Sequence, residues 1–326
     1  MKKSILERHR GEAHMEKIAH EHKASVYLGI DWGGTYIKAG IVNSNGKILK
    51  KIVYSSGSLR ERKAFIGEIK RLKETFRKYN IKAVGVGAPG IIDVERGSIY
   101  YLPNIPGWEN FPLKTILTKE LKIPVFIDND ANIFALAEVR RGAGRRSRRA
   151  IFLTLGTGLG GAVISDGKIL EGRTSASELG HVVIDINGKH CGCGGSGCIE
   201  TFTGSNHLLE RYRQLKKMKT APKEVKEIFD RAKAKQKEAL IVWKEFSAYL
   251  GKFLAGMVNI FNPQIIIFGG GVSGAFSLFG PFLWRVLKEQ AMWPQLADLK
   301  LVKAKLEDAG IIGAALLAKE KLEERK

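Results

Sequence analysis

Two stretches of the chain share one pattern of apolar and polar positions. LGIDWGGTYIKAGIVNSNGKIL occupies residues 28–49, and LTLGTGLGGAVISDGKIL occupies residues 153–170. In each, an apolar strand, a glycine-rich turn and a second apolar strand are followed by a tight Asn-Gly or Asp-Gly turn that begins a third strand. The chain is therefore predicted to contain an internal repeat, each copy of which opens with a strand hairpin.

After each hairpin the pattern changes to alternating helices and strands. The first half continues with a helix near 59–79, the strand KAVGVGAPG, a helix near 112–121, the strand PVFIDND and the helix ANIFALAEVRRG. The second half continues with a helix near 238–261, the strand QIIIFGGG, a further helix, the strand LKLVKAKL and a last helix from about 309. This order predicts an α/β protein of two similar lobes, with mixed sheets covered by helices and a cleft between the lobes as the expected ligand site.

The composition adds a compartment and a domain division to this picture. A chain of 326 residues with 44% apolar residues suits a globular protein of two lobes, and none of its apolar runs is long enough to cross a bilayer. The first residues are charged and lack the apolar block of a signal peptide, so we expect a cytoplasmic protein. The expected parts are a mobile basic extension over residues 1–24, a small lobe over 25–128 to which the helix 309–326 returns, and a large lobe over 129–308.

The charge is strongly positive. The chain has 54 Lys and Arg against 33 Asp and Glu, a formal net charge of +21, which by itself favours an anionic partner. The basic residues, however, occur in helical segments such as RLKETFRKYN, among apolar residues at helical spacing. We therefore expect a solvated surface that attracts anionic substrates such as nucleotides, and neither a nucleic-acid partner nor a membrane.

All three cysteines lie in one glycine-rich segment, GHVVIDINGKHCGCGGSGC, residues 180–198. The spacing CxCxxxxC brings three soft thiolates within reach of one metal ion, and one more ligand completes a tetrahedron. Two histidines compete for that place: His190 is adjacent to the first cysteine, where neighbouring side chains tend to point apart, whereas His181 lies upstream and can fold back. Such a closed set predicts a structural zinc site that shapes the segment carrying Glu178, His181 and Glu200.

Glycines and polar residues at strand ends are the candidates for chemistry. Backbone N–H groups in a glycine turn form an anion-binding nest, so the two repeats predict two turns that bind the two ends of a polyphosphate. The strand PVFIDND ends in polar residues and precedes a helix, which places a carboxylate either as a catalytic group or as a cap on the first helical N–H groups.

Eight motifs follow one another in a fixed order along residues 26 to about 320: IDWGGTYIKAG, GAPGIID, PNIPGW, DNDANIFALAE, LGTGLGGAVISDGKI, ELGHVVI, CGCGGSGCIE and NPQIIIFGGGVS. In this order they resemble the sugar kinases of the ROK family, and the cysteine segment is the most specific of them. The resemblance implies the actin-like ATPase fold, with two RNase H-like lobes. It also implies a glucokinase-like phosphotransferase of carbohydrate metabolism that uses MgATP and a hexose and forms a homodimer or homotetramer.

The resemblance implies a role for each matching residue. Asp130 becomes the general base toward the sugar hydroxyl, with Asp128 as a rival two residues back on the strand, and Asp31 is expected to hold Mg²⁺ through water. The implied sugar-binding residues are Asn104, Asn129, Asp130, Glu178, His181 and Glu200. The implied ATP- and phosphate-binding residues are Asp31, Gly33, Gly34, Thr35, Lys38, Gly156, Thr157, Gly158, Gly269, Gly270 and Gly271. The implied zinc ligands are His181, Cys191, Cys193 and Cys198.

Two residues depart from the family pattern. Trp32 stands where a small aliphatic residue is usual, and it either narrows the phosphate turn or packs beneath it. Ser177 stands where glycine commonly precedes the glutamate, and it is expected to shift Glu178 and so the sugar preference. Neither change removes a functional group.

Several functions compete. Transfer of the γ-phosphoryl group of ATP to the 6-hydroxyl of glucose comes first. An N-acetylglucosamine or N-acetylmannosamine kinase is the alternative, since DNDANIFALAE and CIETF also resemble those enzymes, and polyphosphate is a possible donor that suits the positive charge. A sugar-responsive repressor is the remote alternative, because the residues ahead of Val26 show no two-helix pattern of a DNA-binding module.

Overall fold

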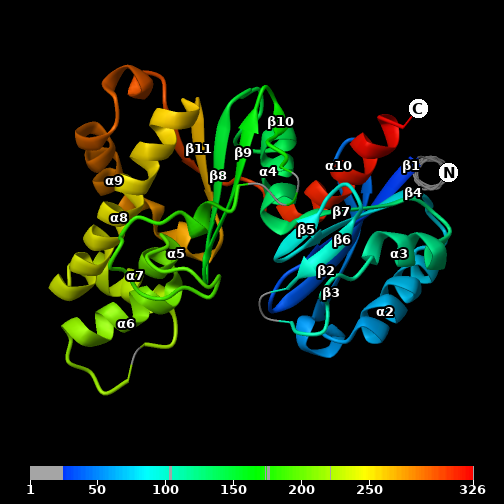
Figure 1. Ribbon diagram of the computed structural model, residues 1–326, viewed down its shortest axis with the longest axis horizontal. Coiled ribbons are helices and arrows are strands. Elements are labelled where there is room, and N and C mark those ends of the chain that lie inside the picture. The colour runs from blue at the N-terminus through cyan, green and yellow to red at the C-terminus, as the bar shows by residue number, and fades with distance from the viewer. Residues whose placement is uncertain (1–24, 103–104, 173, 175–176, 221, 326) are drawn as a thin grey trace, which may run out of the picture. The chain divides into compact units, whose positions relative to one another are not determined.

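The computed structural model describes residues 25–102, 105–172, 174, 177–220 and 222–325 (Figure 1). The extension 1–24 and Asn104 lie outside the described residues. The described chain divides into two compact units, which are treated separately below: unit 1 runs up to Phe134 and resumes at Asp308, and unit 2 is Ala135–Glu307.

Unit 1 is built on a five-stranded mixed sheet with the order β3-β2-β1-β4-β7. Its strands are β1 (Ser25–Trp32), β2 (Tyr36–Asn43), β3 (Ile48–Ser55), β4 (Asn80–Ala88) and β7 (Val125–Asn129). β1, β2 and β3 pair antiparallel, as the hairpin pattern predicts, whereas β1, β4 and β7 are parallel. A short antiparallel pair, β5 (Ile91–Asp93) with β6 (Ser98–Tyr101), follows β4 and was not predicted.

Helices cover both faces of this sheet (Figure 1). They are η1 (Ser56–Leu59), α2 (Arg62–Thr75), α3 (Leu113–Leu121), the first turn of α4 (Asp130–Arg141) and α10 (Ala309–Glu323). α2 and α3 pack their leucines and phenylalanines on one face, against Val26, Leu28 and Ile30 of β1. α10 lies on the other face at very close range, because a Cβ atom on Gly29 or Gly85 would overlap its backbone.

Unit 2 repeats the same topology, with the sheet order β10-β9-β8-β11-β12. Its strands are β8 (Ala150–Leu155), β9 (Leu159–Ser165), β10 (Lys168–Ile169), β11 (Ile265–Gly269) and β12 (Lys300–Lys303). Again the first three are antiparallel neighbours and the last two run parallel to the first. The internal repeat predicted from the two hairpins is therefore confirmed in the strand order of both sheets.

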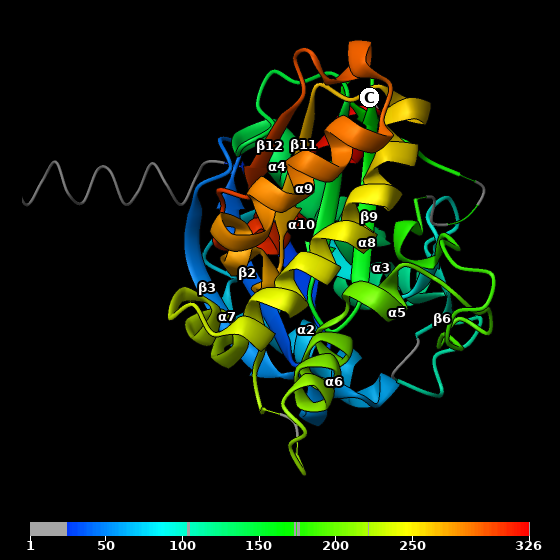
Figure 2. The same ribbon diagram turned by 90° about the vertical axis from the view of Figure 1, so that its left-hand side faces the viewer.

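The helices of unit 2 are η2 (Leu179–His181), α5 (Glu200–Thr203), α6 (Ser205–Leu215), α7 (Val225–Lys233), α8 (Lys237–Phe261), η3 (Gly271–Ala275), α9 (Phe276–Gln290) and η4 (Trp293–Leu296). Figure 2 shows α8 and α9 lying across the strands of the sheet. Trp243, Phe246 and Phe279 join these two helices to the sheet core. None of the described helices is long and apolar enough to span a membrane.

The division between the units falls inside α4, six residues beyond the position 128/129 given by the sequence. The first turn of α4 stays with unit 1 because Ile133 packs on Gly87 of β4 and its carbonyl lies against Gly313 of α10. The candidate site residues at the end of β7 therefore belong to unit 1.

Candidate active site and metal centre

The first glycine turn joins β1 to β2 in unit 1. The Gly33 N–H donates to the Tyr36 carbonyl at 3.0 Å, while the Ser56 hydroxyl donates to the Gly33 carbonyl at 2.6 Å. The Ser56 N–H also donates to the Thr35 carbonyl at 2.9 Å. These bonds fix the turn from the η1 side and leave Gly34 and Thr35 exposed, which suits the expected contact with phosphate.

Asp31 and Lys38 face one another beside this turn. They are directly opposed in the β1–β2 ladder, and the Asp31 carboxyl lies against Gly310 at the start of α10. Burial raises the pKa of Asp31 to about 6, Lys38 opposes the rise, and the nearby Asp308 adds to it. A buried carboxylate that lacks full compensation favours a cation, so this position fits the expected Mg²⁺ ligand.

Trp32 packs beneath the turn. Its ring stacks on Phe65 of α2 at 4.1 Å between centroids and meets Trp108 edge-on at 4.7 Å. Trp108 comes from the PNIPGW motif and donates its indole N–H to the Arg60 carbonyl at 2.7 Å. Of the two roles considered for Trp32, the structure thus supports packing in the core of unit 1.

The two candidate carboxylates at the end of β7, Asp128 and Asp130, differ in burial and in hydrogen bonding. Asp128 is buried, and its Oδ1 accepts hydrogen bonds from the Asn129 N–H at 2.7 Å and the Asn132 side chain at 2.8 Å. It therefore fastens the strand to the first turn of α4. Asp130 is half-buried at the first position of α4, where its Oδ1 accepts from the Ala131 N–H at 2.9 Å. Of the two, Asp130 is the more accessible to a substrate.

Asn129 lies between them in the sequence, and its side-chain amide is hydrogen-bonded to backbone groups at both of its polar atoms. Its Oδ1 accepts from the Ala131 N–H at 2.8 Å, and its Nδ2 donates to the Gly90 carbonyl at 3.1 Å. One amide hydrogen and one lone pair remain for a ligand. Gly90 belongs to the GAPGIID motif, so the amide also ties that loop to the end of β7.

The second glycine turn joins β8 to β9 in unit 2 and is held by α5. Glu200 Oε2 accepts from the Leu159 N–H at 3.0 Å, and a Cβ atom on Gly158 would overlap this carboxylate. The Ser205 N–H donates to the Gly156 carbonyl at 2.9 Å. Glu200 was expected to bind a sugar hydroxyl; here one of its oxygens supports the turn that contains Thr157.

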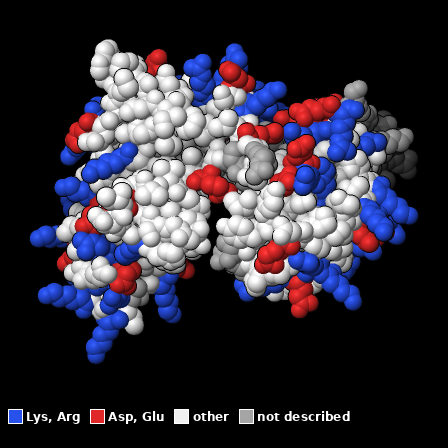
Figure 3. Space-filling model, in the orientation of Figure 1, with Lys and Arg blue, Asp and Glu red and all other residues white. Residues whose placement is uncertain are grey.

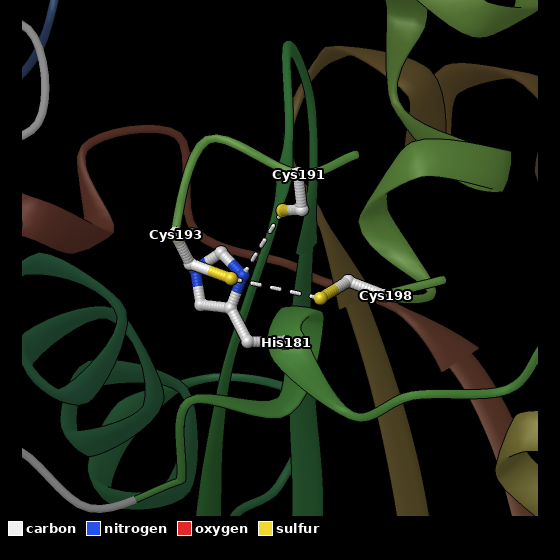
Figure 4. Close-up of side chains that lie close together, drawn as sticks. All are labelled: His181, Cys191, Cys193 and Cys198. Carbon is white, nitrogen blue, oxygen red and sulfur yellow. Dashed lines mark hydrogen bonds between the residues drawn. The ribbon is translucent and has the colours of Figure 1, made fainter. Parts of the chain in front are cut away.

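The three cysteines and His181 gather at one point of unit 2 (Figure 4). Their ligand atoms all lie within 4.8 Å of one another. Cys191 Sγ is 3.6 Å from His181 Nδ1, and Cys193 Sγ is 3.6 Å from Cys198 Sγ. A tetrahedron with zinc–sulfur bonds of about 2.3 Å has edges of roughly 3.7 Å, so the cluster has the dimensions of a zinc site.

The chemistry of the four groups also fits a metal. Burial, followed by the neighbouring thiols, raises the pKa of Cys198 to about 12, and burial raises that of Cys191 as well. Cys193 is exposed, and backbone hydrogen bonding lowers its pKa. A bound cation would offset the cost of holding thiolates in this position.

Of the two competing histidines, His181 joins the cluster. It ends η2, which brings its ring to Cys191, whereas His190 bridges to Ser196 along the loop and is exposed. Glu200 Oε1 lies 3.8 Å from Cys191 Sγ. The same carboxylate thus touches both the cysteine cluster and the second glycine turn.

Glu178 precedes η2. Burial raises its pKa, the nearby Glu200 adds to the rise, and His181 opposes it. Ser177 before it has φ +66°, and its buried hydroxyl has no hydrogen-bond partner among the described residues. Glycine adopts this backbone region without cost, which explains why glycine is the usual residue there.

The third glycine run ends β11. Gly270 has φ +79°, and a Cβ atom on it would overlap the Leu155 carbonyl, whereas Gly271 faces open space. A cavity of about 270 Å³ lies beside it, lined by Gly271, Gly274, Val272 and Ala275 of η3 and by Val225, Lys226 and Phe229 of α7. The α7 residues were not predicted as part of a binding site, because no motif marks this amphipathic basic helix.

Comparisons with known proteins agree with this arrangement. The sequence model of the ROK family matches residues 27–321. The chain is 38% identical to a glucokinase of Thermotoga maritima, over 90% of this chain and 98% of that one. It resembles the structure of a ROK family glucokinase from Streptomyces griseus in complex with glucose and AMPPNP, with a TM-score of 0.77, 30% identity and coverage of 90% and 99%. It also resembles a putative N-acetylmannosamine kinase from Listeria monocytogenes, with a TM-score of 0.79, 27% identity and coverage of 92% and 100%.

Proposed function

The chain belongs to the ROK family, and from this membership we propose that it is an ATP-dependent glucokinase, which transfers the γ-phosphoryl group to the 6-hydroxyl of glucose. Its two units carry the repeated sheets of the actin-like ATPase fold. The observation that carries the proposal is the pair of glycine turns at equivalent positions of these two sheets, within a chain similar to glucokinases over 90% of its length.

Unit 1 supplies the groups for proton transfer and for the metal of MgATP. Asp130 accepts the proton of the sugar hydroxyl as that oxygen attacks phosphorus, because it is the accessible carboxylate at the end of β7. Asp31 would hold Mg²⁺ through water, and Lys38 with the Gly33–Thr35 turn would contact phosphate oxygens. Mg²⁺, when bound, offsets the negative charge of the phosphate groups.

Unit 2 supplies the second phosphate turn, the adenosine site and part of the sugar pocket. Gly156, Thr157 and Gly158 contact phosphate, and the cavity beside Gly271 takes the adenosine, with the Phe229 ring as an apolar wall. Glu178 and His181 of this unit are proposed to bind sugar hydroxyls. The same role is proposed for Asn129 of unit 1 and for Asn104, which lies outside the described residues. Glu200 completes this set with the oxygen that does not bind Leu159.

We propose that His181, Cys191, Cys193 and Cys198 would hold a structural zinc ion. With four protein ligands, a zinc ion there would have no open position for substrate and would serve to fix the loop. The cytoplasmic location, the homodimer or homotetramer and the preference for ATP over polyphosphate remain predictions.

A sugar panel tests this function. We expect kcat/KM with MgATP to be highest for glucose among glucose, mannose, fructose, N-acetylglucosamine and N-acetylmannosamine. An N-acetyl sugar with the highest value would assign the enzyme to the alternative activity and leave the fold, zinc and base unchanged. Absence of turnover with all five sugars and with polyphosphate as donor would contradict a kinase.

A further inference from the structure

One loop of unit 2 concentrates positive charge that the proposed reaction does not use. Residues 141–149, RGAGRRSRR, connect α4 to β8 and contain five arginines and no acidic residue. We call this segment the arginine loop. The general expectation that basic residues are spread among apolar ones does not hold here, because the loop contains no large apolar side chain.

The arginines of the loop are exposed and mostly unpaired. Arg141, Arg145, Arg146, Arg148 and Arg149 are all exposed. Within the described part of the chain their only ion pair is Arg148 with Asp166, at 3.3 Å, and both of these side chains are mostly exposed, at 74% and 69%. The other four guanidinium groups are thus available to an external anion.

The backbone of the loop is fixed from inside the unit. The buried Glu138 accepts from the Ala143 N–H at 2.7 Å through its side chain, and its carbonyl accepts from Gly142 and Gly144 at 2.9 and 3.0 Å. Gln264 Oε1 accepts from the Arg148 and Arg149 N–H groups at 2.9 and 3.1 Å. The charges are therefore presented from a structured backbone.

One position of the loop carries a strained backbone. Arg146 has φ +75°, a region that costs a residue with a Cβ atom about 1 kcal/mol and that glycine or asparagine adopts more readily. Nothing inside the unit compensates for this choice, because the Arg146 side chain has no partner among the described residues. The Arg146 guanidinium group is therefore available to an external anion.

Further lysines extend the charge along the same end of the sheet. Gln264 connects the loop to Lys300, whose N–H donates to the Gln264 carbonyl at 3.1 Å, and Lys168 follows the turn whose Gly167 N–H donates to the Arg148 carbonyl at 2.8 Å. Lys168 and Lys300 are both exposed. Figure 3 shows blue side chains gathered where the β9–β10 hairpin ends. This is the end where β8 and β11 begin, opposite to the end that carries Gly156 and Gly270.

We propose that the arginine loop docks the phosphate backbone of a nucleic-acid duplex, without reading its sequence. Guanidinium groups match phosphate oxygens with paired hydrogen bonds, and five of them on one short, hydrogen-bonded loop suit the closely spaced phosphates of a duplex. The loop has no aromatic side chain for stacking on single-stranded bases and no exposed apolar side chain for insertion into a lipid surface. The net charge of +21 supports the encounter.

The test is fluorescence anisotropy of a fluorescein-labelled 20-base-pair DNA duplex, titrated with the full chain at 50 and 200 mM NaCl. Five phosphate contacts predict a salt slope of about −4.5, which weakens binding roughly 500-fold between these concentrations. The variant with Arg141, Arg145, Arg146 and Arg149 all changed to Gln should bind at least about tenfold more weakly at 50 mM NaCl, with a slope near −1.

A matched control removes four charges elsewhere. Lys50, Lys63, Arg77 and Lys82 are exposed residues of unit 1, and their change to Gln should leave duplex affinity within about twofold. Equal losses in both variants would mean that binding follows net charge alone and would overturn the proposal. So would absence of wild-type binding, or binding to phosphatidylserine vesicles in its place. Unchanged glucose phosphorylation by both variants shows that they are folded.

Discussion

The two glycine turns occupy the same place in their sheets but are fixed by different parts of the chain. In unit 1, Ser56 binds the Gly33 and Thr35 carbonyls, and it directly follows the third strand of the same hairpin. In unit 2, Glu200 and Ser205 bind the turn, and both follow the cysteine segment. The strands of the two repeats therefore correspond, whereas the second turn is supported by residues that follow the cysteine segment.

The groups proposed for proton transfer and Mg²⁺ binding and the residues that support the second glycine turn therefore lie on different units. The proposed base, Asp130, and the proposed Mg²⁺ ligand, Asp31, lie on unit 1, whose sheet is held by apolar packing and close glycine contacts. The second phosphate turn depends on a carboxylate that also lies against the Cys191 thiol. Changes in the two units should therefore have different signatures.

The largest effect is expected from Asp130→Asn. General base catalysis contributes about 10²–10⁴-fold, so kcat should fall by that factor while glucose binding and zinc content stay close to those of the wild type. Steady-state kinetics and calorimetric titration with glucose measure the two parts. Turnover within a fewfold of the wild type would show that another group acts as the base.

Cys193→Ser should act on unit 2 without removing a catalytic group. Loss of one of four ligands should lower zinc content and, through the loosened loop, lower Tm by roughly 10 °C. Metal analysis and calorimetry provide the measurement. His190→Ala is the matched control, since His190 lies outside the cluster, and it should change neither quantity. Full zinc retention by the serine variant would exclude Cys193 as a ligand.

In metal-free buffer, Asp31 should make the free energy of unfolding depend on pH. Its pKa is about 6 in the folded protein, against 3.8 as the ordinary value, so the folded state binds its proton more tightly. The free energy of unfolding should therefore fall as pH rises from about 4 to about 6, by up to roughly 3 kcal/mol. Asp31→Asn should remove this fall. Denaturant titrations across that pH window measure the free energy of unfolding of both proteins. If it changed with pH in the same way in both, the raised pKa of Asp31 would be contradicted.

Substitutions of Glu200 test whether this side chain supports the second glycine turn, a support that unit 1 lacks. Glu200→Ala leaves the Leu159 N–H without its acceptor, and we expect KM for ATP to rise about tenfold. Glu200→Gln keeps an oxygen in place and should restore most of the affinity for ATP. A change in KM for glucose alone, with KM for ATP unaltered in both variants, would restrict Glu200 to the sugar pocket.

The smallest effect is expected at Ser177. Its φ of +66° and unpartnered hydroxyl predict that Ser177→Gly raises the free energy of unfolding by about 1 kcal/mol. Urea titration measures this gain. A destabilised glycine variant would show that the serine hydroxyl makes a contact in solution.

Local patterns predicted the framework well. Apolar runs, Asn-Gly and Asp-Gly turns and helical spacing gave the hairpins, the β4–β7 and β11–β12 alternation and α10 close to their observed bounds. The helix expected near 59–79 is shorter, Arg62–Thr75, because η1 occupies the residues before it. The cysteine spacing likewise identified the cluster that the structure brings together.

Contacts between residues that are far apart in the sequence could not be predicted from local patterns. Phe229 and Gly271 line one cavity although α8 separates them in the sequence. Glu200 likewise binds Leu159, with the cysteine segment between them in the sequence. Trp32 departs from the family pattern, and in the structure its ring stacks on Phe65 and meets Trp108 edge-on. These pairings depend on the packed fold and are not encoded in neighbouring residues.

Glucokinase activity is tested most directly by ³¹P NMR of the products that the wild-type protein forms from glucose and MgATP. We expect glucose 6-phosphate and ADP in equal amounts. ADP with free phosphate and no sugar phosphate, or phosphate on another hydroxyl of glucose, would contradict it.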